Sequence, residues 1–274
     1  MTEFPEGAPC WADAMFKDVE GAKTFYGEVL GWTFGESSSE YGNYTQAYKD
    51  GKAVAAVVPP MPGGDGADEA PSAWCLYLAS QDAEAAAEKV TKAGGKLLMG
   101  PMRVGEFGTM AIAQEPTGAV FGIWQAGEHK GFELVASSGA YCWAELFTRD
   151  GPTADAFMTS VFPYGAQRMD PGEDPDAMDM DFSVYSLGGP RNPVLGRMVM
   201  GPDFPPEVPS YVQVYFAVDD CDAAVAKARE LGGQLYFGPM DSPFGRFAAI
   251  ADQQGAAFAV IDVTRTVGEM PAFG

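Results

Sequence analysis

The chain has 274 residues, enough for two domains of ordinary size, and 47% of them are hydrophobic, as expected of a globular protein. Its formal net charge of −21 repels nucleic acid and anionic membranes, so we expect neither as a partner. No apolar run approaches the roughly 18 residues that a membrane helix needs, and the first residues lack the pattern of a signal peptide. These features together predict a cytoplasmic protein.

The first structural unit, residues 9–66, begins with a short apolar strand that leads into Asp18. An aspartate at this point is a natural helix N-cap, because its carboxylate accepts hydrogen bonds from the unpaired N–H groups of the first turn. The helix that follows carries Phe25 and Tyr26, and three short strands complete the unit. The pattern predicts a β-α-β-β-β module.

The second unit, residues 71–126, has the same plan in clearer form. Its first strand, residues 74–79, leads to Asp82, and an alanine-rich helix is expected over 83–93. Gly94 and Gly95 then supply the left-handed C-cap that glycine adopts without strain. Three further strands follow, separated by glycine-containing turns.

A linker, residues 128–139, follows the second unit. It contains His129, the only histidine of the chain, among polar residues, and we expect this side chain at the surface. A catalytic pair of histidine with serine or cysteine is therefore not expected. The four cysteines are widely separated and are interpreted as structural thiols: Cys10, Cys75, Cys142 and Cys221.

The rest of the chain repeats the first part. Residues 209–240 match 71–102, and residues 141–163 match the beginning of the first unit more weakly. Third and fourth modules are thus expected at 140–205 and 209–264, where the acidic run 169–181 is interpreted as a solvated loop. The predicted fold is α+β, with four β-α-β-β-β modules in two tandem domains, 1–127 and 140–274, built on curved mixed sheets. Whether the modules pair in order or crosswise stays open.

Alternation along the first strand of each module separates two faces. One face is apolar in all four strands, as packing against the helix of the module requires. The other face mixes aromatic residues with one polar group per strand, which suits the wall of a ligand cavity, although filling of the core by these aromatics is the alternative. We expect this second face to bind a ligand through Trp11, Asp13, Cys75, Tyr77, Trp124, Trp143, Glu145, Gln213 and Tyr215.

Four such modules resemble the vicinal oxygen chelate superfamily, which has the glyoxalase, bleomycin-resistance and dioxygenase fold. The resemblance rests on the strand–Asp–helix starts, the Gly-Gly and Gly-Pro-Met elements, and the segments EPTGAVFGIW and DQQGAAFAVI. The segment WAELFTRD at 143–150 is similar to the fused four-module actinobacterial proteins of the Cfp30B type.

In the metal-using members of this superfamily, His, Glu or Gln ligands lie on the first and last strands of the modules. Carrying those positions over gives Trp11, Cys75, Gly122, Trp143, Gln213 and Ala259. Of these, only Gln213 is a suitable ligand and Cys75 a remote one, whereas a catalytic divalent ion needs about three. We therefore expect no metal and no other cofactor.

Two main functions remain. The first is metal-independent binding of an aromatic or hydrophobic small molecule, of the drug-sequestration or natural-product tailoring accessory type, with Trp11 and Trp143 as stacking surfaces. The second is a glyoxalase-like lyase or isomerase, or another enzyme of this superfamily, in which Asp13 or Glu145 has a raised pKa and acts as the catalytic base. A role as accessory to a partner enzyme is a further alternative, and the chain is expected to be a monomer or homodimer.

Overall fold

The computed structural model describes residues 4–60, 72–170 and 180–274. All four expected β-α-β-β-β modules are present. The first contains β1 (Pro9–Met15), α1 (Val19–Leu30), β2 (Thr33–Phe34), β3 (Thr45–Lys49) and β4 (Lys52–Val58). The second contains β5 (Trp74–Ala79), α2 (Ala83–Lys92), β6 (Lys96–Val104), β7 (Gly108–Gln114) and β8 (Val120–Ala126).

The second half of the chain repeats this order. The third module contains β9 (Tyr141–Thr148), α3 (Gly151–Val161), β10 (Tyr164–Arg168), β11 (Phe182–Leu187) and β12 (Pro193–Val199). The fourth contains β13 (Tyr211–Ala217), α4 (Cys221–Glu230), β14 (Gln234–Ser242), β15 (Gly245–Ala251) and β16 (Ala257–Asp262). The predicted α+β fold is confirmed, and most of the acidic run, residues 171–179, lies outside the described residues.

Each helix begins at the aspartate that the sequence marks. The carboxylates of Asp18, Asp82, Asp150 and Asp220 each accept a hydrogen bond from a backbone N–H in the first helical turn, at 2.9 to 3.0 Å. Gly94 and Gly232 follow α2 and α4 with positive φ angles, as a glycine C-cap requires. No helix among the described residues is long and apolar enough to cross a membrane.

The modules pair in chain order, which settles the alternative that the sequence leaves open. The first sheet has the strand order β2-β3-β4-β1-β5-β8-β7-β6, and the second has the equivalent order β10-β11-β12-β9-β13-β16-β15-β14. The two first strands of each pair, β1 with β5 and β9 with β13, lie antiparallel at the centre of their sheet. The edge strands of the second sheet are therefore β10 and β14.

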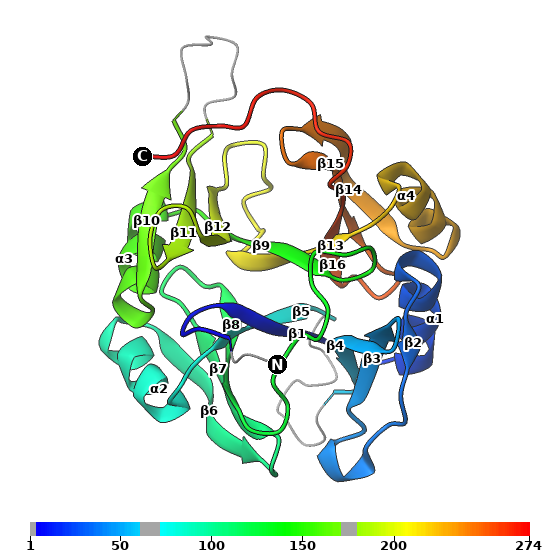
Figure 1. Ribbon diagram of the computed structural model, residues 1–274, viewed down its shortest axis with the longest axis horizontal. Helices are drawn as coiled ribbons and strands as arrows, with labels where there is room; N and C mark the ends of the chain where they lie inside the picture. The colour runs from blue at the N-terminus through cyan, green and yellow to red at the C-terminus, as the bar shows by residue number, and fades with distance from the viewer. Residues whose placement is uncertain (1–3, 61–71, 171–179) are drawn as a thin grey trace.

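The two sheets lie back to back and share one core (Figure 1). Helix α1 packs beside α4 and α2 beside α3, so each helix also contacts the other half of the chain. Between the sheets, the rings of Trp74 and Phe216 meet with centroids 5.2 Å apart, and those of Tyr26 and Phe258 are 5.4 Å apart. The apolar face of the central strands therefore packs against the other sheet as well as against the helices.

A buried chain of hydrogen bonds crosses this core. The indole N–H of Trp74 donates to the hydroxyl of Tyr26 at 3.0 Å, and that hydroxyl donates to the carboxylate of Asp252 at 3.0 Å. All three side chains are buried. Since buried polar groups are costly when left unpaired, this chain helps to fix how the two halves of the protein fit together.

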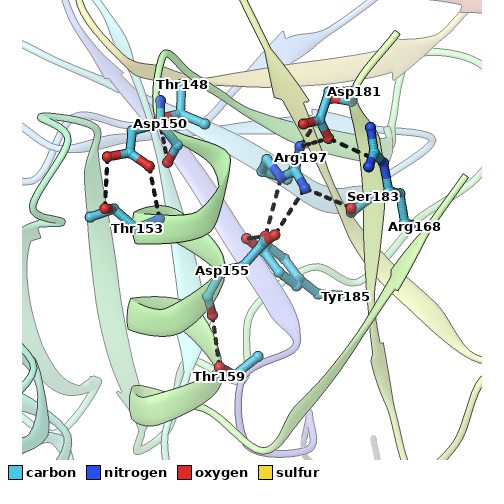
Figure 2. A network of polar contacts seen from close by, with 10 residues as sticks. All are labelled: Thr148, Asp150, Thr153, Asp155, Thr159, Arg168, Asp181, Ser183, Tyr185 and Arg197. Atoms are coloured by element: carbon cyan, nitrogen blue, oxygen red, sulfur yellow. Dashed lines mark hydrogen bonds and ion pairs between the residues drawn. The ribbon is translucent and has the colours of Figure 1, made fainter. Parts of the chain in front are cut away.

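A second polar network lies between α3 and the second sheet (Figure 2). Arg197 is 3% exposed and makes ion pairs with Asp155 on α3, at 2.9 Å, and with Asp181, at 2.6 Å. The hydroxyl of Tyr185 donates to Asp155, and Ser183 accepts from Arg197. A buried guanidinium needs such partners, and here they fasten the helix to β11 and β12.

Candidate functional site

The residues predicted to bind a ligand in the first half of the chain share one face. In the pairing of β1 with β5, Trp11 lies opposite Tyr77 and Asp13 lies opposite Cys75. On the next strand, β8, Gly122 lies beside Tyr77, and Trp124 follows two residues later on the same face. Because alternate residues of a strand point to the same side, these side chains lie on the face turned away from the second sheet. We call it the first outer face.

The second half of the chain forms the equivalent surface. Gln213 lies opposite Glu145, Tyr215 opposite Trp143, and Tyr215 also lies beside Ala259 of β16. We call this the second outer face. The structure thus divides the predicted ligand residues into two sets on opposite sides of the molecule.

The first outer face holds a half-buried carboxylate. Asp13 accepts hydrogen bonds from the hydroxyl groups of Tyr44, at 3.4 Å, and Tyr77. Burial raises its pKa to about 7, against an ordinary value of 3.8, although the two hydroxyl groups oppose the shift. Burial also raises the pKa of the Cys75 thiol well above its usual range, and the Asp13 charge adds to that, so this thiol is protonated near neutral pH.

Glu145 takes the equivalent position on the second outer face. Its carboxylate accepts hydrogen bonds from the Tyr215 hydroxyl, at 2.7 Å, and from the Trp143 indole N–H, at 3.3 Å. Burial raises the pKa of Glu145, and these two donors oppose the shift. Both outer faces therefore carry one acid that is held by aromatic donors in a largely apolar setting.

At the positions where metal-using members of the vicinal oxygen chelate superfamily carry their ligands, the residues of this chain are not suited to hold a metal ion. The Tyr77 ring covers Gly122, so closely that a Cβ atom there would overlap the ring. Trp11 uses its N–H to donate to Tyr44, at 2.6 Å. Within the part of the chain that the structure describes, no three His, Cys, Asp or Glu side chains come together in a way that would hold an ion.

The prediction that His129 lies at the surface is wrong. Its ring packs edge-on against Trp11, with centroids 4.4 Å apart, and lies 5.6 Å from Trp124, whose N–H donates to the His129 carbonyl at 3.0 Å. Burial lowers the pKa of His129 to about 4, so the imidazole is uncharged at neutral pH. Its Nε2 atom is buried and makes no hydrogen bond to any described residue.

The linker around His129 covers the first outer face. Phe132 lies 5.5 Å from Trp11 and is 5% exposed, and its backbone N–H donates to the carbonyl of Cys10 at 2.8 Å. As a result Trp11 is only 3% exposed, and it belongs to the large core that both sheets share. The chain itself therefore occupies much of the space beside Trp11 where a ligand was expected.

The second outer face is less completely covered. Tyr215, Ala259 and Ile261 form a small apolar cluster of their own, with half-buried Trp143 and Phe247 packed against it. Gln213 is 5% exposed, and its side-chain amide is not among the buried polar groups of the described residues that lack a hydrogen-bond partner. Trp143 thus remains half-buried, whereas its counterpart Trp11 is buried.

The C-terminal segment crosses from one edge of the second sheet to the other (Figure 1). At β14, Thr266 bridges to Ser242, and Val267 donates to the Ser242 carbonyl at 2.9 Å. At β10, Gly274 and Arg168 exchange two backbone hydrogen bonds, at 3.0 and 3.1 Å. The segment after the last strand therefore runs between the sheet edges here, whereas the segment after β8 folds back onto its own sheet.

Sequence reasoning missed two contributors, Tyr44 and His129. Neither lies in a segment that the internal repeat aligns, so no counterpart drew attention to them. A cleft of about 400 Å³ was also not expected. This cleft does not belong to either outer face. It lies between the β7–β8 turn, the start of α3 and the loop before β13, and its lining includes Thr117, Arg149, Thr153 and Ser210.

Comparison with known proteins gives a consistent result. A family model described as the Glyoxalase/Bleomycin resistance protein/Dioxygenase superfamily matches residues 11–123. A protein of Mycobacterium tuberculosis with the name "Putative glyoxylase CFP32" is 35% identical to this chain over 263 residues. The alignment covers 95% of this chain and 96% of that protein. The anthracycline biosynthesis protein DnrV of Streptomyces peucetius is 36% identical over 273 residues, covering 96% of both chains.

Solved structures show the same fold at lower sequence identity. The Mn(II)-bound glyoxalase of Novosphingobium aromaticivorans aligns with a TM-score of 0.62 at 16% identity, covering 97% of this chain and 88% of that one. The paired modules, the family model and the relatives that align over nearly the whole chain all indicate the same family. The chain therefore belongs to the glyoxalase/bleomycin resistance protein/dioxygenase superfamily, also called the vicinal oxygen chelate superfamily.

Proposed function

We propose that this protein binds a planar aromatic or hydrophobic small molecule on an outer face of its sheets, without a metal ion. The observation that carries the proposal is the arrangement of Glu145, an acid of raised pKa held between Trp143 and Tyr215 on an apolar surface. Indole and phenol rings bind planar ligands by stacking or edge-on packing. A carboxylate in their midst selects ligands that donate a hydrogen bond or carry a positive charge.

The relatives favour a particular class of ligand. DnrV of Streptomyces peucetius and DauV of a Streptomyces species, each 36% identical to this chain, are named for anthracycline biosynthesis. Anthracyclines are polycyclic aromatic compounds with hydroxyl and carbonyl groups, which suit a surface with aromatic walls and a few polar side chains. We therefore favour a natural product of this chemical kind, which the protein sequesters or presents to a tailoring enzyme.

Titration of intrinsic tryptophan fluorescence with an anthracycline aglycone tests this function. We expect saturable quenching that is the same in the presence of EDTA and of added Ni²⁺ or Zn²⁺, and no change in the absorption spectrum of the recovered ligand. Quenching that requires the added metal would contradict metal-independent binding. Consumption of the ligand would contradict a pure binding role.

One observation favours an enzyme as the second candidate. The pKa of Asp13, raised to about 7, is suitable for a group that accepts and returns a proton near neutral pH. In this alternative, Asp13 or Glu145 removes a proton next to a carbonyl, as in an isomerase or a glyoxalase-like lyase. Turnover of a thiol adduct of a 2-oxoaldehyde that disappears in Asp13→Asn or Glu145→Gln, but not in Cys75→Ala, would establish it.

A further inference from the structure

The segment that follows the last strand differs between the two halves of the molecule. After β8, residues 127–133 turn back over the first outer face and place His129 edge-on to Trp11 and beside Trp124. After β16, the chain leads to the edge strand β14, where Thr266 bridges to Ser242. The segment after the last strand therefore covers the outer face in the first half of the molecule, whereas in the second half it leads to the edge of the sheet.

The contacts of His129 resemble those of a bound aromatic molecule. Its ring is uncharged, is packed between two indoles, and has a buried Nε2 that makes no hydrogen bond to a described residue. Packing and ring geometry hold it, not the chemistry of a histidine. Edge-on packing is one of the two arrangements that aromatic rings prefer. The position beside Trp11 is thus an aromatic slot that the chain fills with one of its own side chains.

The second outer face has the same framework without that ring. By the internal repeat, Trp143 corresponds to Trp11 and Ile261 to Trp124. Among the described residues, no aromatic ring packs against Trp143 as His129 packs against Trp11. In addition, Gln213 replaces Cys75 directly opposite the acid, so a side chain that can both donate and accept hydrogen bonds stands beside Glu145.

We propose that His129 occupies, in the first half, the position that the ring of a ligand takes in the second half. Each chain then binds one ligand, edge-on to Trp143 and over Ile261. Directly opposed residues of neighbouring strands have Cβ atoms about 5 Å apart, so Glu145 and Gln213 can hold adjacent substituents of one ring. The carboxylate accepts from a hydroxyl while the Gln213 amide donates to a neighbouring carbonyl. The preferred ligand is therefore a planar aromatic with a hydroxyl beside a carbonyl. This inference rests on the proposed function.

Calorimetric titration with a peri-hydroxyanthraquinone, and with its O-methyl ether as matched control, tests the stoichiometry and the polar contacts. We expect one molecule bound per chain, and about tenfold or greater weakening for the ether, which has lost the donor to Glu145. Binding should be lost in Trp143→Ala and retained in His129→Phe, which keeps a ring in the first slot. Two molecules per wild-type chain, or equal binding of the ether, would overturn the inference.

The variant His129→Gly tests the slot itself, because it removes the ring that the chain supplies. We expect it to bind imidazole or phenol beside Trp11, with a rise in its thermal midpoint that His129→Phe does not show. A cooperatively folding His129→Gly that gains no small-ring binding would contradict the inference. If that variant does not fold, the stoichiometry of the wild type decides. If the wild type binds no polycyclic aromatic at all, the proposed function fails, whereas imidazole binding by His129→Gly still reports whether the first slot accepts a ring.

Discussion

The two outer faces are built from repeated segments of the sequence but differ in what covers them. Each keeps a tryptophan and an acid on the first strand and a tyrosine on the next, and each tyrosine lies beside a small residue. On the first face the linker adds His129 and Phe132, and Trp11 becomes part of the main core. On the second, the chain runs between the sheet edges, and Trp143 stays half-buried in a small separate cluster. Two repeated surfaces of one chain thus differ in burial, and the second is the one for which we propose ligand binding.

The largest expected difference between the faces is in the response to loss of the tryptophan. Trp11→Ala removes a side chain that is 3% exposed, and we expect it to lower the free energy of unfolding by about 3–5 kcal/mol. Trp143→Ala should cost clearly less stability, because Trp143 is half-buried, but should abolish ligand binding. Chemical denaturation and fluorescence titration of both variants test this. A large loss of stability in Trp143→Ala with ligand binding retained would contradict the proposed difference between the two faces.

The pH dependence of stability should show that the first face is a closed environment. The pKa of Asp13 is raised to about 7, so its contribution to stability is present below the unfolded pKa, near 4, and is lost as the pH rises through about 7. The pKa of His129 is lowered to about 4, so its contribution is present above the unfolded pKa, near 6.5, and is lost as the pH falls through about 4. Between about pH 4 and 6.5 the two effects oppose each other.

Single substitutions should separate these two effects. In Asp13→Asn the free energy of unfolding, relative to wild type, should increase as the pH rises from about 4 to 7, by up to about 4 kcal/mol at about 1.4 kcal/mol per pKa unit. In His129→Phe it should increase relative to wild type as the pH falls from 6.5 to 4, by up to about 3 kcal/mol. Urea denaturation at a series of pH values measures both. Parallel profiles for wild type and variants would show that these groups are not buried as described.

A smaller effect is expected from the acid of the second face. Glu145→Gln keeps the size of the side chain but removes its charge, and hydrogen bonds to charged groups contribute about 1.5–3 kcal/mol. We expect affinity for a hydroxylated polycyclic aromatic to fall by about ten- to 100-fold, with little change for an unsubstituted ring. Asp13→Asn is the matched control on the first face and should leave the affinity unchanged. Equal losses of affinity in both variants would mean that each of the two faces binds the ligand.

Much of the fold could be predicted from the sequence, because the determinants of each module are local. The capping aspartates and paired glycines mark the ends of the helices, and alternation along the first strands sorts the two faces, as Asp82 and Trp143 illustrate. Module pairing could not be predicted, because either order buries the same apolar faces. The hydrogen bond from Tyr26 to Asp252 joins residues far apart in the chain, and no local pattern marks it.

The position of His129 was mispredicted for a related reason. Its neighbours in the chain are charged or small, which is typical of a surface linker. Its burial depends on tertiary contacts with Trp11 and Trp124, which come from two different strands. The individual residues of each outer face were identified by their periodicity, but which face is covered depends on the path of segments that have no periodicity.

Fluorine NMR of the protein labelled with fluorotryptophan tests most directly whether the second outer face alone receives the ligand. The five tryptophans give five resonances, which single Trp→Phe variants assign. On titration with a peri-hydroxyanthraquinone, we predict that the Trp143 resonance shifts and saturates at one equivalent, while those of Trp11 and Trp124 stay in place. A shift of the Trp11 or Trp124 resonance in place of Trp143 would contradict the account.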